Sequence, residues 1–300
     1  MYLSLVSKSK LVVLNKSIQI DYPRLFELLK LRNIEIAVMT PTFAEILLMD
    51  KNFNSDLLPN LKTIYFCGEI LSTKTAKELL NRFNELIVIN SYGPTECTVA
   101  VTFVNIDNEM VKEEILPIAD FKLYKQNANI YILDENLKEV EEGNIGEILI
   151  CGKSVADGYL NSKNDRFILF NGEKGYLTGD LGYIKNNKLY YKERKDRQIK
   201  YKGYRIELSD IEQNVEKIEE IEKCKVIPKV IDNKVVKIIA YVKLNKNSNK
   251  TAIELQKELK KYLPDYMCPK IKILEDFPIN NNGKIDIEKL KEVTNGRENN

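Results

Sequence analysis

The 300-residue sequence contains no histidine and no tryptophan. Without histidine the chain cannot hold a Ser-His or Cys-His nucleophile, a histidine general base or a histidine-ligated metal. Its five cysteines, at positions 67, 97, 151, 224 and 268, form no CxxC pair, which excludes a thiolate zinc cluster and a redox dithiol. Single cysteines scattered through a chain of this size indicate a reducing, cytoplasmic setting.

Long apolar runs and a strong charge of one sign are also lacking. No stretch approaches the roughly 18 apolar residues of a membrane span, and no signal peptide opens the chain, so we expect no membrane insertion. Lys and Arg number 46 and Asp and Glu 44, giving a net charge of +2, which is too balanced for a dedicated nucleic-acid binder. With 44% hydrophobic and 30% charged residues, the composition is that of an ordinary globular protein.

Strand-like and helix-like periods alternate in the first part of the chain. We expect strands at 11–14, 34–39, 61–66 and 86–89, and helices at 23–31, 42–49 and 73–83. This alternation predicts crossover units and a parallel α/β sheet over residues 1–103, with ligands beyond the carboxyl ends of its strands. Two loops leave those ends, at 67–69 and at 90–96.

The pattern changes twice further along. Short strands separated by Gly and Asn turns predict an antiparallel, barrel-like subdomain over residues 104–195. Residues 196–300 are typical of a small α+β domain. Two of its helices are expected to begin with capping boxes, Ser209-x-x-Glu212 and Thr251-x-x-Glu254.

The segment 90–96 (Asn-Ser-Tyr-Gly-Pro-Thr-Glu) carries the most informative chemistry. Its Gly-Pro pair favours a tight turn at which the backbone can approach a ligand. Tyr92 offers a flat face for a base and Thr95 a hydroxyl for a phosphate. Glu96 offers a hard oxygen for Mg²⁺, which usually takes one or two carboxylates plus phosphate oxygens. A plain turn with a capping threonine fits the composition equally well.

Three further segments have a functional and a structural interpretation each. Asp180, between two glycines, can accept hydrogen bonds from the vicinal hydroxyls of a ribose, although Gly-Asp turns are common. Residues 192–205 hold seven basic side chains and two tyrosines. They fit a nucleic-acid surface, a solvated basic strand, or an anion site in which Arg194 meets a sugar phosphate. Lys284 is either an exposed turn lysine or a cation that a loop delivers to a phosphate and a carboxylate.

Five motif regions occur in a fixed order along nearly the whole chain. They are Tyr92-Gly93-Pro94-Thr95-Glu96, Gly146-Glu147 with Gly158-Tyr159-Leu160, Thr178-Gly179-Asp180, Arg194-x-Asp196 leading to Gly203-Tyr204-Arg205-Ile206-Glu207, and Asn282-Gly283-Lys284-Ile285-Asp286. In this order and spacing they resemble the AMP-forming adenylating ligases. Within that superfamily, Phe66-Cys67-Gly68-Glu69 and the segment 96–102 (Glu-Cys-Thr-Val-Ala-Val-Thr) are most similar to the D-alanine–D-alanyl carrier protein ligases that serve teichoic acid D-alanylation.

The resemblance implies an adenylate-forming fold: an α/β part, a barrel-like subdomain and a small α+β C-terminal lid. It implies ATP and Mg²⁺, D-alanine as the substrate and a phosphopantetheinylated D-alanyl carrier protein as the partner, with no nucleic acid. D-alanine would first be activated as D-alanyl-adenylate, and the lid would then turn so that the carrier thiol takes the alanyl group.

The resemblance also implies a role for each matching residue. The nucleotide would be bound by Asn90, Ser91, Tyr92, Gly93, Pro94, Thr95, Asp180, Tyr191, Lys192, Glu193, Arg194 and Lys284. Glu96 would hold Mg²⁺, and Cys67 and Val99 would line the alanine pocket. Lys284 would be the catalytic clamp on the substrate carboxylate and α-phosphate. Asp196 would be the hinge of the lid.

Several family features are missing from the 300 residues. The glycine-rich Ser/Thr loop that ends in Pro-Lys-Gly and cradles the β- and γ-phosphates is absent, as is the segment whose Asp holds the amino group. Glu193 and Ala119 stand where the family usually has glycine. We therefore expect an N-terminally truncated chain that adenylates poorly alone, unless an upstream chain supplies the loop.

Two other interpretations stay open. The chain could be a peptide-synthetase-type adenylation domain for another small amino acid, or a non-catalytic module that binds a carrier or nucleic acid through residues 192–205.

Overall fold

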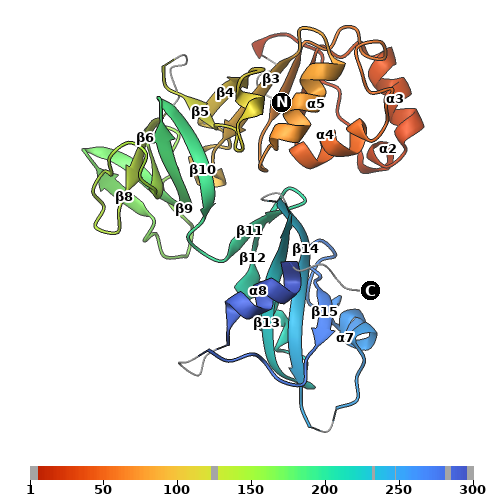
Figure 1. Ribbon diagram of the computed structural model, residues 1–300, viewed down its shortest axis with the longest axis vertical. Coiled ribbons are helices and arrows are strands. Elements are labelled where there is room, and N and C mark those ends of the chain that lie inside the picture. Colours follow the sequence, from red (N-terminus) through yellow and green to blue (C-terminus); the bar gives the residue numbers. More distant parts are fainter. Residues whose placement is uncertain (1–5, 123–127, 232–233, 247, 281–284, 296–300) are drawn as a thin grey trace.

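A computed structural model describes residues 6–122, 128–231, 234–246, 248–280 and 285–295. In these ranges the strands form four sheets, of four, six, two and three strands. Figure 1 shows them following one another along the chain, with the helices gathered at the two ends of the molecule. Nowhere in these ranges is a helix long and apolar enough to cross a membrane.

The N-terminal sheet is built from the expected alternation of strands and helices. Its elements, with two preceding helices, are α2 (Lys16–Gln19), α3 (Tyr22–Leu31), β1 (Ile36–Met39), α4 (Pro41–Leu48), β2 (Thr63–Phe66), α5 (Thr73–Arg82), β3 (Ile87–Tyr92) and β4 (Thr102–Ile106). The strand order is β1-β2-β3-β4; the first three strands are parallel and β4 is antiparallel to β3. The predicted parallel sheet is confirmed for β1 to β3.

Local sequence explains where these helices begin. The Asp21 side chain accepts the Arg24 amide at the start of α3, and Ser72 accepts the Thr75 amide at the start of α5. Both contacts satisfy backbone donors that lack a partner in the first turn. On the face toward the helices, Ile64, Phe66 and Val88 have no exposed surface and form the main core with residues of α4 and α5.

The predicted strand at 11–14 is wrong. The structure has no strand there, and Leu11 and Val13 are exposed. A run of β-branched and aliphatic residues forms a strand only where a neighbouring strand offers a ladder of hydrogen bonds. Instead, Leu14 packs against the main core, and the Asn15 side chain caps α2.

The second sheet is antiparallel, as expected. It contains β5 (Ala119–Asp120), β6 (Asn129–Leu133), β7 (Gly146–Cys151), β8 (Phe167–Phe170), β9 (Glu173–Lys185) and β10 (Lys188–Arg194). The order is β5-β10-β9-β7-β6, and β8 pairs with β9. Two short 3₁₀ turns, η1 (Thr95–Cys97) and η2 (Met110–Lys112), lie between the sheets in the sequence. The long strand β9 carries Asp180 into the middle of this sheet, beside Arg194 of β10.

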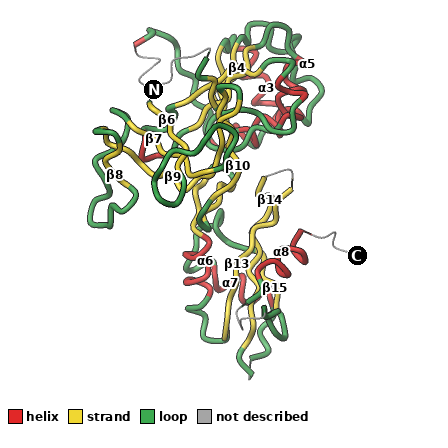
Figure 2. The backbone as a smooth tube through the Cα atoms, turned by 60° about the vertical axis from the view of Figure 1, so that its left-hand side comes forward, coloured by secondary structure: helices red, strands yellow, loops and turns green. Residues whose placement is uncertain are grey.

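The C-terminal part consists of a hairpin followed by an α+β unit. Its elements are β11 (Gln198–Tyr201), β12 (Tyr204–Glu207), α6 (Leu208–Val215), β13 (Ile221–Ile231), β14 (Lys234–Leu244), α7 (Ala252–Leu259), β15 (Lys270–Ile273) and α8 (Ile287–Asn295). The strand order is β13-β14-β15, with β15 parallel to β14. Ile211, Val215, Val226 and Leu255 are buried in one core between α6, α7 and this sheet. Figures 1 and 2 show the part from β11 onward as a separate body below the other two sheets.

The expected division of the chain into units 1–103, 104–195 and 196–300 stays a prediction. The chain passes from β10 to β11 through residues 195–197, and strand β4 continues to Ile106, beyond the expected end of the first unit.

One of the two predicted capping boxes is present. Thr251 accepts the Glu254 amide and Glu254 accepts the Thr251 amide at the start of α7. At the start of α6 the box is absent because the helix begins at Leu208 and Glu212 has tertiary partners. Two hydrogen bonds from Arg197 at 2.6 and 2.8 Å hold that carboxylate. A charged partner therefore outcompetes the local cap.

The cap at Thr251 and its absence at Ser209 allow a matched test of stability. Thr251→Ala removes the side-chain acceptor at a helix N-terminus and should lower the free energy of unfolding by about 1 kcal/mol. Ser209→Ala, which removes no cap contact, should change it by less than about 0.5 kcal/mol. Chemical denaturation of the two variants measures both values, and equal losses would contradict this description of the helix starts.

Candidate functional site

The loop after β3 is fastened by two buried polar side chains. The Asn90 amide nitrogen donates to the carbonyl of Pro117 at 2.8 Å, and the Ser91 hydroxyl donates to the carbonyl of Phe66 at 2.7 Å. Both side chains are buried. They hold the strand end against its neighbours, and their predicted contact with a nucleotide stays a prediction.

Gly93 stands where two backbone segments meet. A Cβ atom there would lie 2.6 Å from the carbonyl oxygen of Val99, closer than a side chain tolerates, and 3.0 Å from Cα of Ala100. Pro94 then leads into the turn η1, and Thr95 is exposed at the start of that turn. Glycine at 93 is therefore required by the approach of the returning chain.

The two residues expected to line the alanine pocket lie together. The Cys67 thiol donates to the carbonyl of Val99 at 3.7 Å. Val99 has φ of 72° and follows Thr98 with φ of 63°, so a β-branched residue is held in the left-handed region. Such backbone strain persists only where the surroundings impose it, and it concentrates at functional sites. The contact places the Cys67 thiol against the backbone of Val99, while the role of both residues in substrate binding stays a prediction.

Asp180 forms a buried cluster with Tyr92 and Arg194. Only 1% of Asp180 is exposed. The Tyr92 hydroxyl donates to Oδ2 at 2.6 Å, and Arg194 Nη1 donates to Oδ1 at 2.8 Å. Burial, and then the charge of Asp180, raises the pKa of Tyr92 well above its ordinary value, so the hydroxyl keeps its proton and remains a hydrogen-bond donor. A buried carboxylate needs such partners, because an unpaired charge is costly away from water.

Asp196 accepts hydrogen bonds from two arginines. Arg194 reaches both of its oxygens, with Nε at 2.8 Å and Nη2 at 2.5 Å, and Arg166 adds a contact of 2.7 Å. Burial acts to raise the pKa of Asp196, but the hydrogen bonds and charge of Arg194 outweigh it and lower that pKa. The predicted hinge thus lies directly after β10 and is tied to the Asp180 cluster through Arg194.

Glu96 is enclosed by groups from three segments of the chain: a loop, strand β9 and strand β12. Tyr159 and Tyr176 both donate hydrogen bonds to its Oε1, the latter at 2.8 Å. Arg205 Nη1, on the C-terminal hairpin, lies 2.9 Å from Oε1 and 2.8 Å from Oε2. The ring of Phe167 packs against both tyrosines, with centroids 5.3 and 4.9 Å away. Burial acts to raise the pKa of Glu96, but the Tyr159 hydrogen bond and the contacts after it lower it.

Gln198 joins the two carboxylate clusters. Its Oε1 accepts from Arg194 Nη2 at 2.8 Å and from Arg205 Nε at 2.6 Å. On the same hairpin, the Lys200 ammonium lies 5.5 Å from the centroid of the Tyr92 ring. The hairpin β11–β12 therefore contacts both Tyr92 and Glu96, residues of the loop that the sequence singled out.

A cavity of about 540 Å³ lies between this hairpin and the second sheet. Its lining residues are Thr95, Glu96, Ala156, Gly158, Tyr159, Phe167, Gln198, Arg205, Ile206, Glu207, Asp210 and Met267. The lining combines a hard carboxylate, a guanidinium and aromatic rings, a mixture suited to a polar ligand with charged groups.

The remaining predicted residues are placed as follows. Tyr191 is half-buried on β10, whereas Lys192 and Glu193 on the same strand are exposed. A register shift between Tyr191 and Glu193 brings Arg194 opposite Asp180. Lys284 lies outside the described residues, so its catalytic role stays a prediction.

The Glu96 carboxylate is a chemically suitable ligand for Mg²⁺, but Arg205 lies against it in this arrangement. In the part of the chain that the structure describes, no three acidic or cysteine side chains converge in a metal-binding group. Mg²⁺ is nevertheless often held by one carboxylate plus substrate phosphates and water. Because Arg205 contacts both oxygens of Glu96 in this arrangement, an ion bound there would lie beside a like charge, and withdrawal of the guanidinium would favour its binding.

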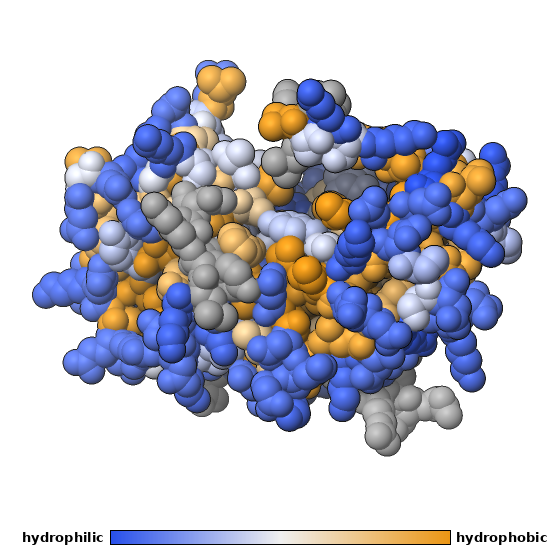
Figure 3. Space-filling model, turned by 90° about the horizontal axis from the view of Figure 1, so that it is seen from above, coloured by the Kyte–Doolittle hydropathy of each residue, from blue (hydrophilic) through white to orange (hydrophobic). Residues whose placement is uncertain are grey.

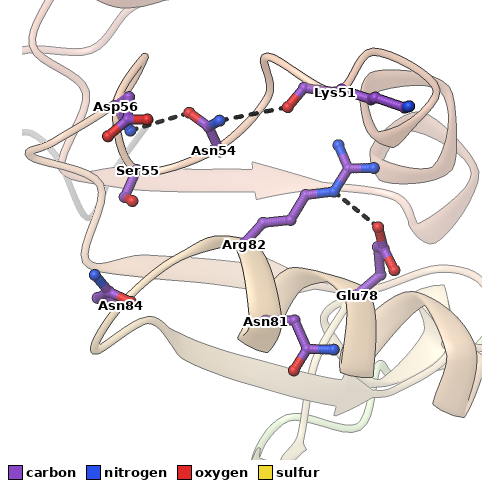
Figure 4. A pocket seen from close by; sticks show the side chains of 8 residues that line it. All are labelled: Lys51, Asn54, Ser55, Asp56, Glu78, Asn81, Arg82 and Asn84. Carbon is purple, nitrogen blue, oxygen red and sulfur yellow. Dashed lines mark hydrogen bonds and ion pairs between the residues drawn. The ribbon is translucent and has the colours of Figure 1, made fainter.

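A second cavity, of about 500 Å³, lies elsewhere in the N-terminal unit (Figure 4). Its lining is polar and is centred on Arg82, which pairs with Glu78 at 2.8 Å. Arg82 also donates to the carbonyls of Asp50 and Leu48 at the end of α4, at 2.6 and 2.9 Å. These contacts join α4 to α5, and none of the predicted site residues lines this cavity.

Comparison with known families decides what kind of protein this is. The family described as AMP-binding enzyme matches residues 1–160, and the AMP-binding enzyme C-terminal domain matches residues 210–284. The chain belongs to the AMP-binding enzyme family.

Curated relatives within this family are longer than the chain. It is 41% identical to the D-alanine--D-alanyl carrier protein ligase of Listeria monocytogenes over 98% of its own length and 59% of the relative's. It is 38% identical to the ligase of the same name from Bacillus cytotoxicus, over 98% of the chain and 60% of the relative. The chain thus spans about three fifths of the length of the relatives it matches.

Solved structures confirm the expected adenylate-forming fold. The adenylation domain AlmE of Vibrio cholerae, solved with glycyl-adenosine-5'-phosphate, superposes with a TM-score of 0.81 at 24% identity, over 97% of this chain and 55% of that one. An NRPS protein containing adenylation and PCP domains, solved with a vinylsulfonamide inhibitor, superposes with a TM-score of 0.74 at 25% identity. The match covers 89% of this chain and 46% of that one.

Sequence reasoning did not assign the partners of Glu96. Tyr159 and Arg205 fall within quoted motifs, and Tyr176 precedes another, but none was given a role at the carboxylate. The available signal was that both tyrosines lie in or beside glycine-containing motifs. Tyr159 and Tyr176 are 63 and 80 residues from Glu96 in the sequence, so their contact with it could not be seen there.

The lowered pKa of Glu96 predicts a pH dependence of stability. A carboxyl whose pKa is lower in the folded protein stabilises it above the ordinary value of 4.5, and that contribution is lost as pH falls through the folded value. The melting temperature of the parent should therefore exceed that of Glu96→Gln at pH 7, and the difference should shrink below pH 4.5.

Glu135→Gln, which alters an exposed acid in a turn, provides the control and should match the parent at every pH. A constant difference between parent and Glu96→Gln from pH 7 down to acid unfolding would contradict the assignment of the ion pair to Glu96.

Proposed function

We propose that this chain carries the adenylate-binding and lid portions of a ligase that activates D-alanine with ATP and transfers it to a carrier protein. The observation that carries this proposal is the linked arrangement Asp180–Arg194–Gln198–Arg205–Glu96, whose last three members line one cavity. Its support in sequence is the 41% identity to a D-alanine--D-alanyl carrier protein ligase over nearly the whole chain. Because the chain covers 59% of that relative, the complete reaction is a proposal for the complete protein.

In the first step, a carboxylate oxygen of D-alanine attacks the α-phosphorus of ATP. An oxygen–phosphorus bond forms, the bond from that phosphorus to the β-phosphate oxygen breaks, and pyrophosphate leaves with the electron pair. Asp180, oriented by Tyr92 and Arg194, would accept hydrogen bonds from the ribose hydroxyls. Glu96 would hold Mg²⁺ once Arg205 withdraws, and the ion would neutralise phosphate charge. Positioning and charge neutralisation suffice for such a transfer, so no histidine is needed.

In the second step, the thiol of a phosphopantetheine arm attacks the carbonyl carbon of the alanyl-adenylate. A thioester forms, the bond from that carbon to the phosphate oxygen breaks, AMP leaves with the electron pair, and the thiol proton passes to water. The hairpin β11–β12 is placed at the cavity in this structure, where Arg205 lies on Glu96 and Lys200 over Tyr92. This arrangement fits a lid that has turned away from the Mg²⁺-bound state. Lys284 would act in the first step as the clamp on the substrate carboxylate and α-phosphate.

The substrate assignment rests on Cys67 and Val99. Their contact at 3.7 Å supports a small pocket wall made from a thiol and a strained backbone turn. An adenylation domain for another small amino acid would share the rest of the site, so this wall is where the two interpretations differ. A cytoplasmic setting and a role in teichoic acid D-alanylation stay predictions.

The nucleic-acid interpretation of residues 192–205 has less support. Arg194 pairs with Asp180, Arg197 with Glu212 and Arg205 with Glu96, all within the protein. Lysine and arginine side chains that face internal carboxylates contribute little to binding phosphates. The lid interpretation explains these pairs, and a nucleic-acid surface does not.

Pyrophosphate exchange into ATP tests the proposal. The full chain is combined with the portion of the Listeria relative that it does not match, and exchange is measured with D-alanine, L-alanine and glycine. We expect exchange that is fastest with D-alanine, and Glu96→Gln should lower it about 10²–10³-fold because a charge-stabilising group is lost. Glu135→Gln is the matched control and should exchange like the parent.

Either of two outcomes would contradict the proposal: no exchange with any of the three amino acids, or equal exchange by Glu96→Gln and Glu135→Gln. Exchange that is faster with L-alanine or glycine would instead support the second interpretation.

Specificity is tested at the pocket wall. Cys67→Gly removes the thiol that contacts Val99 and should abolish the preference for D- over L-alanine in the same exchange assay. Cys268→Ala, at a half-buried cysteine of the C-terminal part, should leave that preference unchanged. An undiminished preference in Cys67→Gly would show that Cys67 does not select the substrate.

A further inference from the structure

An ion pair joins the C-terminal part of the chain to the N-terminal unit. The Lys234 ammonium, at the start of β14, contacts Oε1 of Glu45 in α4, which lies 189 residues away in the sequence. The same oxygen accepts a hydrogen bond from the Thr75 hydroxyl of α5 at 2.8 Å. Because a side chain of the N-terminal unit orients the Glu45 carboxylate, the acceptor keeps its place whatever the position of Lys234.

This pair differs from an ordinary surface pair. Figure 3 shows hydrophilic side chains projecting around the outline of the molecule, where water surrounds them. Lys112 and Glu109 form a pair of that kind, with side chains 67% and 80% exposed. The side chains of Lys234 and Glu45 are 17% and 39% exposed. Water and salt screen a partly buried pair less than an exposed one, so this contact contributes more than most surface pairs.

The joint between the C-terminal part and the rest of the protein is polar. In the described ranges, each core of buried apolar residues lies wholly on one side of the link at 192–198. Contacts across the joint include the pair of Arg205 with Glu96 and the Lys200 ammonium over the Tyr92 ring. Without a shared apolar core, the orientation of the C-terminal part depends on such polar contacts.

The two carboxylates that hold the C-terminal part lie on different elements. Glu96 is in the turn η1 after β3, whereas Glu45 is in α4. Figure 1 shows the upper end of β14 facing the N-terminal unit. A body held at one place can turn about it, and a second contact elsewhere opposes that turn. The pair of Glu45 with Lys234 therefore opposes rotation of the C-terminal part about the contact at Glu96.

We propose that Glu45 and Lys234 form a clasp that holds the C-terminal part in the orientation in which the hairpin β11–β12 lies at the cavity. This inference rests on the two-step function proposed above, in which that orientation serves the transfer of the alanyl group. Neither residue lines the cavity, so both are positioning residues. Opening of the clasp accompanies the turn of the C-terminal part toward the first step.

The orientation of the C-terminal part can be measured without any nucleotide. Spin labels are placed at Lys77 on α5 and Lys257 on α7, two exposed lysines, through a non-canonical amino acid that leaves the five cysteines untouched. Pulsed electron paramagnetic resonance then gives the distribution of distances between the labels in the full chain. We expect one main distance in the parent.

Two variants open the clasp from opposite sides. Lys234→Met removes the cation, and Glu45→Gln removes the charge but keeps an oxygen that accepts from Thr75. Each should lower the ratio of the main distance to all others about fivefold, as expected for loss of a partly buried ion pair. Lys237→Met, at an exposed lysine of the same strand, is the matched control and should keep the parent distribution.

Exchange of the two charges tests whether their attraction is the cause. Glu45→Lys combined with Lys234→Glu should restore the main distance, because the pair is formed again in reverse. Circular dichroism checks that each variant is folded, and Lys234→Met alone suffices if a change at Glu45 disturbs α4.

A kinetic comparison connects the clasp with the proposed function. In the combination used above for pyrophosphate exchange, Lys234→Met should slow transfer from alanyl-adenylate to the carrier thiol about fivefold and should not slow the exchange. A residue that matters only for stability would affect both steps alike.

Four outcomes would overturn the proposal: a parent without a main distance, an unchanged distribution in folded Lys234→Met, an equal shift in Lys237→Met, or unchanged transfer by a Lys234→Met variant whose distribution has shifted. A shifted distribution together with a parent that shows no exchange would refute the proposed reaction and leave the clasp intact.

Discussion

The buried carboxylate of Asp180 is the constraint on which the rest of the site depends. A charge with 1% exposure is tolerated only with close partners, and here Tyr92 supplies one and Arg194 the other. Tyr92 belongs to the end of the parallel sheet, Asp180 and Arg194 to the antiparallel sheet. Satisfying one charge therefore joins two sheets that share no strand. Arg194 extends the same network to Asp196, directly before the C-terminal part begins.

The same principle links the C-terminal hairpin to the body of the protein. Glu96 accepts hydrogen bonds from two tyrosines and from Arg205, so this carboxylate holds the hairpin against the body of the protein. If Glu96 holds Mg²⁺ as proposed, the guanidinium of Arg205 would repel the ion beside it. The position of the hairpin and the loading of Glu96 would then be coupled, which would give a physical reason for a lid that moves between two half-reactions.

Much of the fold could be predicted because its signals are local. Alternating strands and helices, the Asp21 cap and the capping box at Thr251 each depend on residues a few positions apart. The errors arose where a distant partner decides. Residues 11–14 lack a neighbouring strand. The Glu212 carboxylate accepts hydrogen bonds from Arg197 and does not form the expected capping box. At the site, the motifs predicted that Tyr92, Asp180 and Arg194 matter. The enclosure of Glu96 spans up to 109 residues of sequence and could not be inferred from any short pattern.

The central claim is that Asp180, with its two partners, forms part of a nucleotide site. Equilibrium binding of a non-hydrolysable alanyl-adenylate analogue, followed by calorimetry on the full chain combined with the unmatched portion of the Listeria relative, tests it most directly. The account predicts saturable binding to the parent that Asp180→Asn weakens by about tenfold or more, since the amide accepts fewer hydrogen bonds. Unchanged affinity in a folded Asp180→Asn variant, or no binding by the parent, would contradict it.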